Sequence, residues 1–206
     1  MHSMRDTDPV TAAYDRIAGS WRDDRLAGAA SFRERRLLDR LTASLPAAAR
    51  ILDVGCGSGE PIAVYIAERG FRVVGLDGSA RMLEFARRAV PRAEFILGDM
   101  RNAEPGGRFD AIVAWDSVFH IPRSDHAAVF KRFRAWLRPL GRLLVSLGGS
   151  GGNFTSQMHG ETFFYSGHEP PEALRILKRA GFSVEHWEVD DASSRGHIAV
   201  IAARAA

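Results

Sequence analysis

The chain alternates short apolar runs with longer amphipathic stretches, and this alternation limits the possible folds more than any other feature. The first five apolar runs lie at 50–55, 72–77, 94–99, 109–115 and 141–148. The stretches between them, such as "PIAVYIAERG" and "HAAVFKRFRAWL", place apolar residues at helical spacing. Strand and helix in regular succession predict a doubly wound α/β fold, with a parallel sheet covered by helices on both faces.

The last two apolar runs break this rhythm. Runs 182–189 and 197–204 are separated only by "DDASSRG", which is too short for a crossover helix. The two runs are therefore expected to pair as an antiparallel hairpin at the end of the sheet. The prediction is a Rossmann-like domain with seven strands, most of them parallel.

The length of 206 residues suits a single domain. Residues 1–45 read as an N-terminal helical lid with two helices, at 10–26 and 31–45, and residues 50–147 as the core that binds a ligand. Residues 148–168 form an insertion, and residues 169–206 supply a helix and the terminal hairpin. The insertion begins with "GGSGGN", a flexible connector, and is rich in aromatic residues. It is expected to be a substrate wall or an edge hairpin that packs on another subunit.

Composition excludes several classes of protein. The chain has no apolar run of eighteen residues, and its first ten residues lack the apolar segment of a secretory signal, so a cytoplasmic protein without membrane spans is expected. The single cysteine, Cys56, excludes a disulfide framework and a cysteine metal cluster. The net charge of +3 is almost all arginine, and "RERR" at 33–36 reads as a solvated helix face rather than a nucleic-acid site.

A glycine-rich loop follows the first apolar run, in "ILDVGCGSGE". Gly55, Gly57 and Gly59 would let a ligand lie against the backbone, because glycine has no Cβ and adopts positive φ. Asp77 ends the next strand eighteen residues after Gly59, a spacing at which a carboxylate can accept both hydroxyls of a ribose. A dinucleotide and other nucleoside ligands both fit this pattern.

The residue at position 60 distinguishes a dinucleotide from other nucleoside ligands. A dinucleotide fingerprint needs glycine there, and Glu60 would repel a pyrophosphate. The chain also lacks a phosphate-binding P-loop and a Tyr-x-x-x-Lys pair. Five acids are expected around one crevice at the strand ends: Asp53, Glu60, Asp77, Asp99 and Asp116. Each alone could be a helix N-cap, but the group suits a cationic ligand without phosphate. S-adenosylmethionine has the ribose, the adenine, the ammonium and the sulfonium that this crevice requires.

Four segments in register carry a family resemblance, namely "LDVGCGSGEPIA", "VVGLDGSARMLEFAR", "FILGDMR" and "FDAIVAWDSVFHI". From Tyr14 to Arg204 the chain resembles a class I S-adenosylmethionine-dependent methyltransferase, whose terminal hairpin it shares. It is most similar to bacterial small-molecule enzymes with "GSGEP", "AWDS-F-H" and a late "G-H".

The resemblance implies the cofactor contacts. Asp53 would hold the methionine part together with the backbone of the glycine loop, Asp77 would hold the ribose, and Asp99 the adenine amino group. The other residues that it places at the cofactor are Gly55, Cys56, Gly57, Gly78, Ser79, Met100, Arg101, Trp115 and Asp116. Tyr14 and Trp21 lie seven apart on one face of the first helix and would form a lid over the cofactor, although Trp21 could instead pack on the sheet.

Methyl transfer needs alignment and, for a protonated acceptor, a base. His120, beside Asp116 in "WDSVFHIP", is the first candidate, with a packed structural histidine as the alternative. His197 and then Tyr165 are the next candidates for the base, although a structural role is favoured for His197. His159 and His168 are too weak a pattern for a metal site, and no metal is expected.

The leading hypothesis is methyl transfer to a small-molecule acceptor by a monomer or homodimer. RNA or protein methylation is the alternative, but "DSVF" lacks the (N/D)-P-P-aromatic element of exocyclic-amine enzymes, and no nucleic-acid module is attached. A cofactor-binding regulatory subunit without catalysis stays open. A nicotinamide-dependent oxidoreductase is disfavoured by Glu60.

Overall fold

The computed structural model describes residues 8–28, 32, 34–191 and 197–205. The α-helices are α1 (Pro9–Ala27), α2 (Arg35–Thr42), α3 (Ile62–Glu68), α4 (Ala80–Ala89), α5 (Arg123–Trp136) and α6 (Pro170–Arg179), and η2 (Val118–His120) is a short 3-10 helix. The strands are β1 (Arg50–Val54), β2 (Arg72–Asp77), β3 (Glu94–Leu97), β4 (Phe109–Ala114), β5 (Leu137–Leu147), β6 (Gly152–Met158), β7 (Glu161–Gly167), β8 (Phe182–Asp191) and β9 (His197–Arg204).

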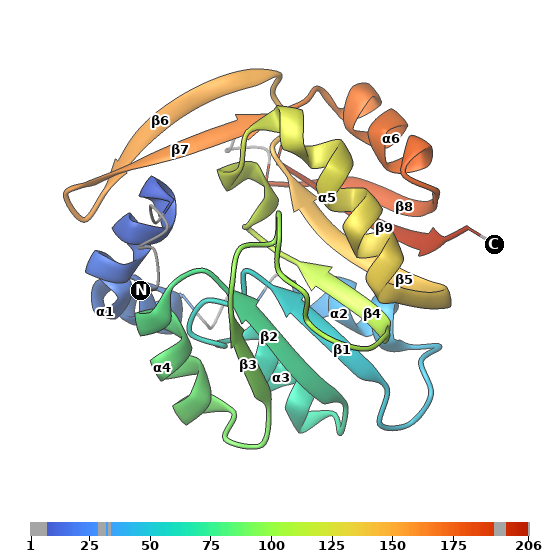
Figure 1. Ribbon diagram of the computed structural model, residues 1–206, viewed down its shortest axis with the longest axis horizontal. Helices are drawn as coiled ribbons and strands as arrows, with labels where there is room; N and C mark the ends of the chain where they lie inside the picture. Colours follow the sequence, from blue (N-terminus) through green and yellow to red (C-terminus); the bar gives the residue numbers. More distant parts are fainter. Residues whose placement is uncertain (1–7, 29–31, 33, 192–196, 206) are drawn as a thin grey trace, which may run out of the picture.

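Seven strands form one twisted sheet in the order β3-β2-β1-β4-β5-β9-β8 (Figure 1). The first five pair in parallel, while β9 runs antiparallel to both β5 and β8. The predicted fold class is therefore confirmed, including the terminal hairpin. Because β1, β2 and β4 are parallel, their carboxyl ends meet at one edge, which brings together Asp53, Asp77 and the residues that follow Ala114.

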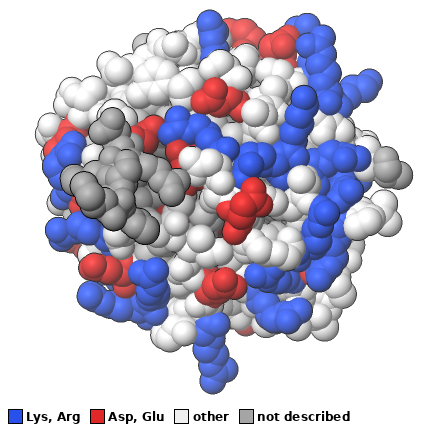
Figure 2. Space-filling model, in the orientation of Figure 1, with Lys and Arg blue, Asp and Glu red and all other residues white. Residues whose placement is uncertain are grey.

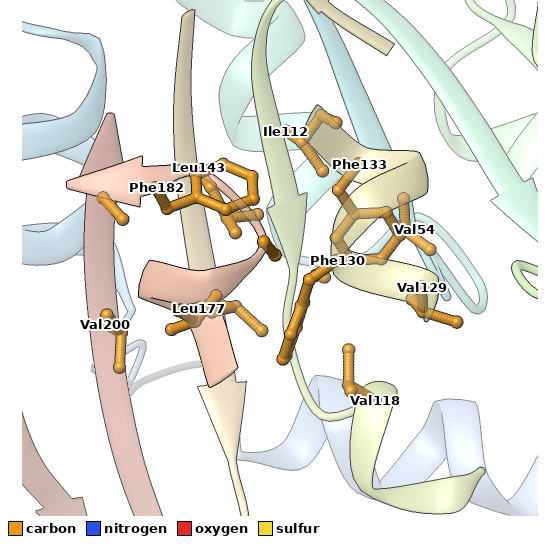
Figure 3. Packing of buried hydrophobic residues seen from close by; sticks show 14 of the residues in the cluster. Val54, Ile112, Val118, Val129, Phe130, Phe133, Leu143, Leu177, Phe182 and Val200 are labelled. Atoms are coloured by element: carbon orange, nitrogen blue, oxygen red, sulfur yellow. The ribbon is translucent and has the colours of Figure 1, made fainter. Parts of the chain in front are cut away.

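Helices cover both faces of the sheet, and each face has its own core. On one face α5 and α6 bury Phe130, Phe133 and Leu177 against β4, β5 and β9 (Figure 3). Val129, Phe130, Phe133 and Trp136 recur at helical spacing, which is why α5 presents one apolar side. On the other face, α2 and α3 pack on the strands through the side chains Leu37, Leu38, Leu41, Ile62 and Ile66. Burial of each large apolar side chain contributes roughly 1.5–3 kcal/mol.

Helix α1 lies apart from these layers, beside the carboxyl edge of the sheet (Figure 1). It begins at Pro9, and the Asp8 carboxylate caps it by accepting from the backbone N–H of Val10 at 2.9 Å. Its buried side packs against Phe163 of β7, which is fully buried. Of the two N-terminal helices that the sequence predicts, only α1 lies over the edge, because the apolar side of α2 packs on the sheet.

The insertion is a separate two-stranded hairpin, β6 with β7, that contacts α1. Its turn is His159-Gly160, and both residues have positive φ, at 49° and 80°, as a two-residue hairpin turn requires. Arg16 of α1 binds Glu161 through two hydrogen bonds of 2.6 and 2.7 Å. The predicted connector at 148–153 is shorter than expected, because Gly152 and Asn153 already belong to β6.

Several boundaries differ from the prediction. Helix α2 spans Arg35–Thr42 rather than 31–45, with Ser31 and Arg33 outside the described residues. Strand β5 begins at Leu137, directly after α5, rather than at 141. The linker between β8 and β9 and the first seven residues also lie outside the described part of the chain. Among the described helices none is long and apolar enough to cross a membrane.

Candidate active site

The glycine loop after β1 is built on positive φ angles. Gly55, Gly57 and Gly59 have φ of 73°, 53° and 78°. A Cβ at Gly55 would lie 2.3 Å from Cβ of Ser117, and one at Gly57 would lie 3.3 Å from the ring of Trp21. The loop therefore needs glycine for its backbone conformation and for the close approach of β4 and α1.

A cavity of about 130 Å³ opens beside this loop, at the carboxyl edge of the sheet. The structure places nearly all the predicted site residues on its walls, namely Tyr14, Trp21, Asp53, Gly55, Cys56, Gly57, Asp77, Gly78, Asp99, Met100, Arg101, Trp115, Asp116 and His120. Ser79 is the exception. Its hydroxyl caps α4 by accepting from the backbone N–H of Met82 at 3.1 Å and also binds Asp15, so it is a buried structural residue.

Two carboxylates on the wall of this cavity, the buried Asp53 and the half-buried Asp77, form no ion pair within the described part of the chain. Asp53 is 2% exposed, and its Oδ2 has no hydrogen-bond partner among the described residues. Burial raises the pKa of Asp53 to about 7, and the nearby charge of Asp77 adds to the effect. Asp77 accepts from the backbone N–H groups of Gly57 and Ser79, each at 2.8 Å, yet burial still raises its pKa. A cationic group of a ligand would stabilise the ionised form of these two carboxylates.

Two other acids of the predicted set already have arginine partners. Asp99 is held by Arg101 through contacts of 2.9 and 2.5 Å, and Arg101 also reaches Asp8 at 2.7 Å. Burial works to raise the pKa of Asp99, but Arg101 outweighs it and the pKa falls. Glu60 forms an ion pair with Arg22 of α1 at 2.7 Å. The arginine offsets the negative charge of Glu60 and so reduces the repulsion of phosphate that the sequence predicts.

Tyr14 and His120 form a hydrogen-bonded pair on the same cavity wall. The Tyr14 hydroxyl lies 2.9 Å from Nε2 of His120, and Nδ1 of His120 lies 2.9 Å from the backbone oxygen of Phe164. A carbonyl oxygen only accepts, so the hydrogen-bond pattern assigns the proton to Nδ1 and makes Nε2 the acceptor of the Tyr14 hydroxyl. Burial lowers the pKa of His120 and raises that of Tyr14, so both are neutral at pH 7.

Asp116 and His197 belong to a second polar cluster. His197 Nδ1 lies 2.7 Å from Asp190, and Nε2 lies 3.1 Å from Asp116. Burial alone would lower the pKa of His197, but the two carboxylates outweigh it and raise the pKa to about 9. Asp116 has φ of 49°, rare for a residue with a side chain, and its backbone N–H donates to Ser146 Oγ at 2.7 Å. The sequence analysis favours a structural role for His197 over that of a base, and the structure places its ring on a cavity wall.

A second cavity, of about 470 Å³, adjoins the first. Six residues line both cavities, namely Tyr14, Trp21, Arg25, Trp115, Asp116 and His120. The other walls come from α1, from described residues between α1 and α2, from the start of α3, and from η2, the β6–β7 hairpin and the facing ends of β8 and β9. The residues are Asp24, Gly28, Phe32, Glu34, Pro61, Phe119, Met158, Tyr165, Asp190 and His197.

Sequence reasoning missed the arginines of α1. Arg25 lines both cavities, pairs with Glu34 at 3.2 Å, and has a buried Nε without a hydrogen-bond partner among the described residues. Tyr14, Trp21 and Arg25 follow one another at spacings of seven and four, so they share one face of the helix. That spacing is the signal that could have found Arg25.

The two loop histidines do not meet. His159 pairs with Asp24 at 2.7 Å, while His168 lies 3.3 Å from the backbone oxygen of Arg123. In the described residues no group of three or more histidine, cysteine or acidic side chains has an arrangement that could hold a metal ion. Cys56 is buried, and burial raises the pKa of its thiol, so its structure offers no support for a nucleophile.

Comparison with known proteins defines the class. A family model described as a methyltransferase domain matches residues 51–141. A protein of Bacillus subtilis (strain 168) named "Putative methyltransferase YqeM" is 32% identical over 171 residues, which cover 76% of this chain and 69% of that protein. The chain therefore belongs to the methyltransferase family. It is a class I S-adenosylmethionine-dependent methyltransferase, and its cofactor is S-adenosylmethionine.

Other relatives match a part of their own length. Trans-aconitate 2-methyltransferase of Azoarcus sp. (strain BH72) is 36% identical over 131 residues, which cover 62% of this chain and 51% of that protein. The chain thus spans about half the length of that relative.

Solved structures share the fold. A TehB-like S-adenosylmethionine-dependent methyltransferase from Corynebacterium glutamicum superposes with a TM-score of 0.72 at 23% identity, covering 95% of this chain and 99% of that chain. The 1,6-didemethyltoxoflavin-N1-methyltransferase of Burkholderia thailandensis, solved with S-adenosylhomocysteine, has a TM-score of 0.68 at 24% identity, covering 95% and 88%.

Proposed function

We propose that the chain transfers a methyl group from S-adenosylmethionine to a small-molecule acceptor held in the second cavity. The observation that carries this proposal is the pair of adjoining cavities with six common wall residues. A cavity of about 470 Å³ suits a small molecule. The names of relatives support the same class, since one is a trans-aconitate and another a phosphoethanolamine methyltransferase.

The walls of the first cavity fit the charged parts of the cofactor. Asp53 Oδ2 would accept from the ammonium, and the unpartnered Nε of Arg25 would donate to the carboxylate of the same amino-acid group. Asp77 has lone pairs left for the ribose hydroxyls after its two backbone contacts. Asp99, which the sequence places at the adenine, would contribute only the lone pairs that Arg101 leaves.

The cofactor supplies a methyl group that is already activated by its sulfonium. The protein has to align the acceptor with that methyl and exclude water. Tyr14 and Trp21 of α1 stand edge to face with their ring centres 6.0 Å apart, and together with Trp115 they border both cavities. These three rings form the apolar part of the wall that the two cavities share.

The Tyr14 and His120 pair gives the acceptor's proton a route. The acceptor would lose its proton to the Tyr14 oxygen while Tyr14 passes its own proton to Nε2 of His120. The imidazolium that forms would keep its Nδ1–H bond to the Phe164 carbonyl. His120 would thus act through Tyr14 rather than by direct contact with the acceptor.

Binding and turnover together test the proposed function. S-adenosylhomocysteine should bind in calorimetry at micromolar concentrations, and a library of small molecules should contain acceptors that release S-adenosylhomocysteine from S-adenosylmethionine. Bulk RNA and protein serve as competing acceptors. Turnover with RNA or protein alone would contradict the proposal, as would the absence of binding.

Ligand analogues test the role of Arg25 separately. Wild-type protein should bind S-adenosylhomocysteine at least about tenfold more tightly than its decarboxylated analogue, because a charge-assisted contact is lost. Arg25→Gln should remove this preference and leave the affinity for the analogue nearly unchanged. An undiminished preference in Arg25→Gln would remove Arg25 from the carboxylate site.

A further inference from the structure

Carboxylates outnumber cations among the described residues that line the second cavity. The carboxylates are Asp24, Glu34, Asp116 and Asp190. The cations are Arg25, which pairs with Glu34, and His197, whose pKa the two flanking acids raise to about 9. His120 stays neutral because burial lowers its pKa. The described walls thus carry a net negative charge at pH 7, which attracts cations and repels carboxylates and phosphates.

Flat aromatic rings form the apolar part of the walls. Phe119 and Tyr165, which line the cavity, stack with their ring centres 5.7 Å apart at 30°. Phe154 lies behind this wall and stacks on Tyr165 at 4.9 Å and 5°. Trp115 and Phe32 also line the cavity. Such rings favour a flat apolar ligand, and their faces attract cations.

Asp116 lies on the wall that both cavities share. Its side chain is 42% exposed, and its left-handed backbone and the contact with Ser146 fix the carboxylate. When a neutral nitrogen takes the methyl group of a sulfonium, the positive charge moves from sulfur to nitrogen. A carboxylate on the wall that both cavities share would stabilise this charge on either atom, although His197 at 3.1 Å from Asp116 Oδ1 offsets a part of its own charge.

We propose that the acceptor is an amine with a flat apolar body, and that its nitrogen receives the methyl group; this assignment rests on the proposed methyl transfer. The ammonium form binds the acidic cavity and first gives one proton to Tyr14, which passes its own to His120. The nitrogen lone pair then forms the bond to the methyl carbon, the carbon–sulfur bond breaks, and its electron pair stays on sulfur. The products are S-adenosylhomocysteine and a methylated ammonium.

Two probes of similar size and opposite charge test the acceptor class. 2-Phenylethylamine and 3-phenylpropionate are titrated separately into protein saturated with S-adenosylhomocysteine, with binding followed by ligand-observed NMR. The amine should bind at least about tenfold more tightly than the carboxylate. Equal or tighter binding of 3-phenylpropionate would overturn the proposal. So would the absence of binding by both probes while S-adenosylhomocysteine binds.

A pair of variants locates the selectivity in the cavity. Asp24→Asn removes a charge that lines the second cavity and not the first, so the amine-to-carboxylate ratio should fall at least about threefold while affinity for S-adenosylhomocysteine is retained. Asp23→Asn on the exposed side of α1 changes the net charge equally outside both cavities and should leave the ratio unchanged. An equal fall in both variants would overturn the assignment. A wild-type protein that does not bind S-adenosylhomocysteine would instead contradict the proposed function.

Discussion

Asp53 shows how a single residue can favour binding over stability. Its carboxylate is buried, its Oδ2 has no hydrogen-bond partner in the described part of the chain, and burial raises its pKa to about 7. A raised pKa means that the folded protein without ligand is stabilised by the protonated form, and that this stabilisation is lost as pH rises through 7. An ammonium group in the cavity reverses this preference, because it binds only the ionised form well.

The affinity for S-adenosylhomocysteine should therefore depend on pH. Below about pH 7 it should weaken by up to about tenfold per pH unit, because Asp53 must lose its proton, and above pH 7 it should level off. Calorimetry between pH 5.5 and 8.5 measures this directly. Asp53→Asn should flatten the profile, apart from any slope that Asp77 contributes. A profile in the wild-type protein without dependence on pH would contradict the role of Asp53.

His197 should change the stability with pH in the same direction as Asp53, but over a higher range of pH. Its pKa is raised to about 9 by Asp116 and Asp190, so its charge stabilises the folded protein fully below the unfolded pKa near 6.5, and this contribution is lost as pH rises through 9. His197→Gln should cost up to about 3 kcal/mol at pH 6, and the difference should shrink by pH 10. Urea unfolding at both pH values checks this, and an equal difference at both would exclude the charge as its cause.

The residue scale also shows where sequence reasoning ends. Acids at strand ends are predictable because the parallel sheet brings those ends to one edge. The ion pair between Glu60 and Arg22 could not be predicted from the sequence. The two residues lie 38 positions apart, and α1 carries charged residues on several sides. Which of them face the sheet depends on how the helix docks, and that is set by packing against Phe163.

At the scale of elements, α1 and the β6–β7 hairpin depend on each other. The hairpin supplies the apolar surface for α1 through Phe163, and the Phe164 carbonyl fixes the tautomer of His120. The sequence left two interpretations of this insertion open, a substrate wall and an edge hairpin on another subunit. The structure has a hairpin that contacts α1 of the same chain and lines the second cavity through Met158 and Tyr165.

Phe163→Ala should loosen this pair of elements. Removal of a fully buried phenylalanine typically costs about 3–5 kcal/mol, and here the loss should fall mainly on the docking of α1. Hydrogen exchange should speed up in α1 and β7 more than in β1 or β4. Phe154→Ala, at a position 42% exposed on the same hairpin, is the matched control and should have a much smaller effect. Uniform acceleration across the sheet would contradict this local view.

At the scale of the whole molecule, the ligand should stabilise the fold by bridging its parts. Walls of the first cavity come from α1, β1, β2 and the segment that follows β4, so S-adenosylhomocysteine should bind only the folded arrangement. At a hundred times its Kd it should add about 2.7 kcal/mol, which corresponds to a rise in Tm of roughly 5–10 °C for a chain of this size. Thermal unfolding with and without ligand measures the rise. NADH at the same concentration is the control and should leave Tm unchanged.

The mostly parallel sheet and its antiparallel end were predictable from the alternation of strands and helices, because the last linker is too short for a crossover helix. The early start of β5 was not predictable. Leu140 adopts a φ of 63°, which no propensity favours, and only the pairing of Phe109 with Leu137 and the burial of Leu137 account for the extension.

The two cavities share α1 but otherwise draw on different parts of the chain. Similarity to the methyltransferase domain covers residues 51–141, which supply most walls of the first cavity, whereas the second is also lined by the β6–β7 hairpin and the facing ends of β8 and β9. Under the proposed function, substitutions in the hairpin and in these strand ends should change acceptor preference without altering Asp53 or Asp77. Divergence of acceptor use within such a scaffold, or its redesign in the laboratory, should therefore proceed in these segments while cofactor use is inherited intact.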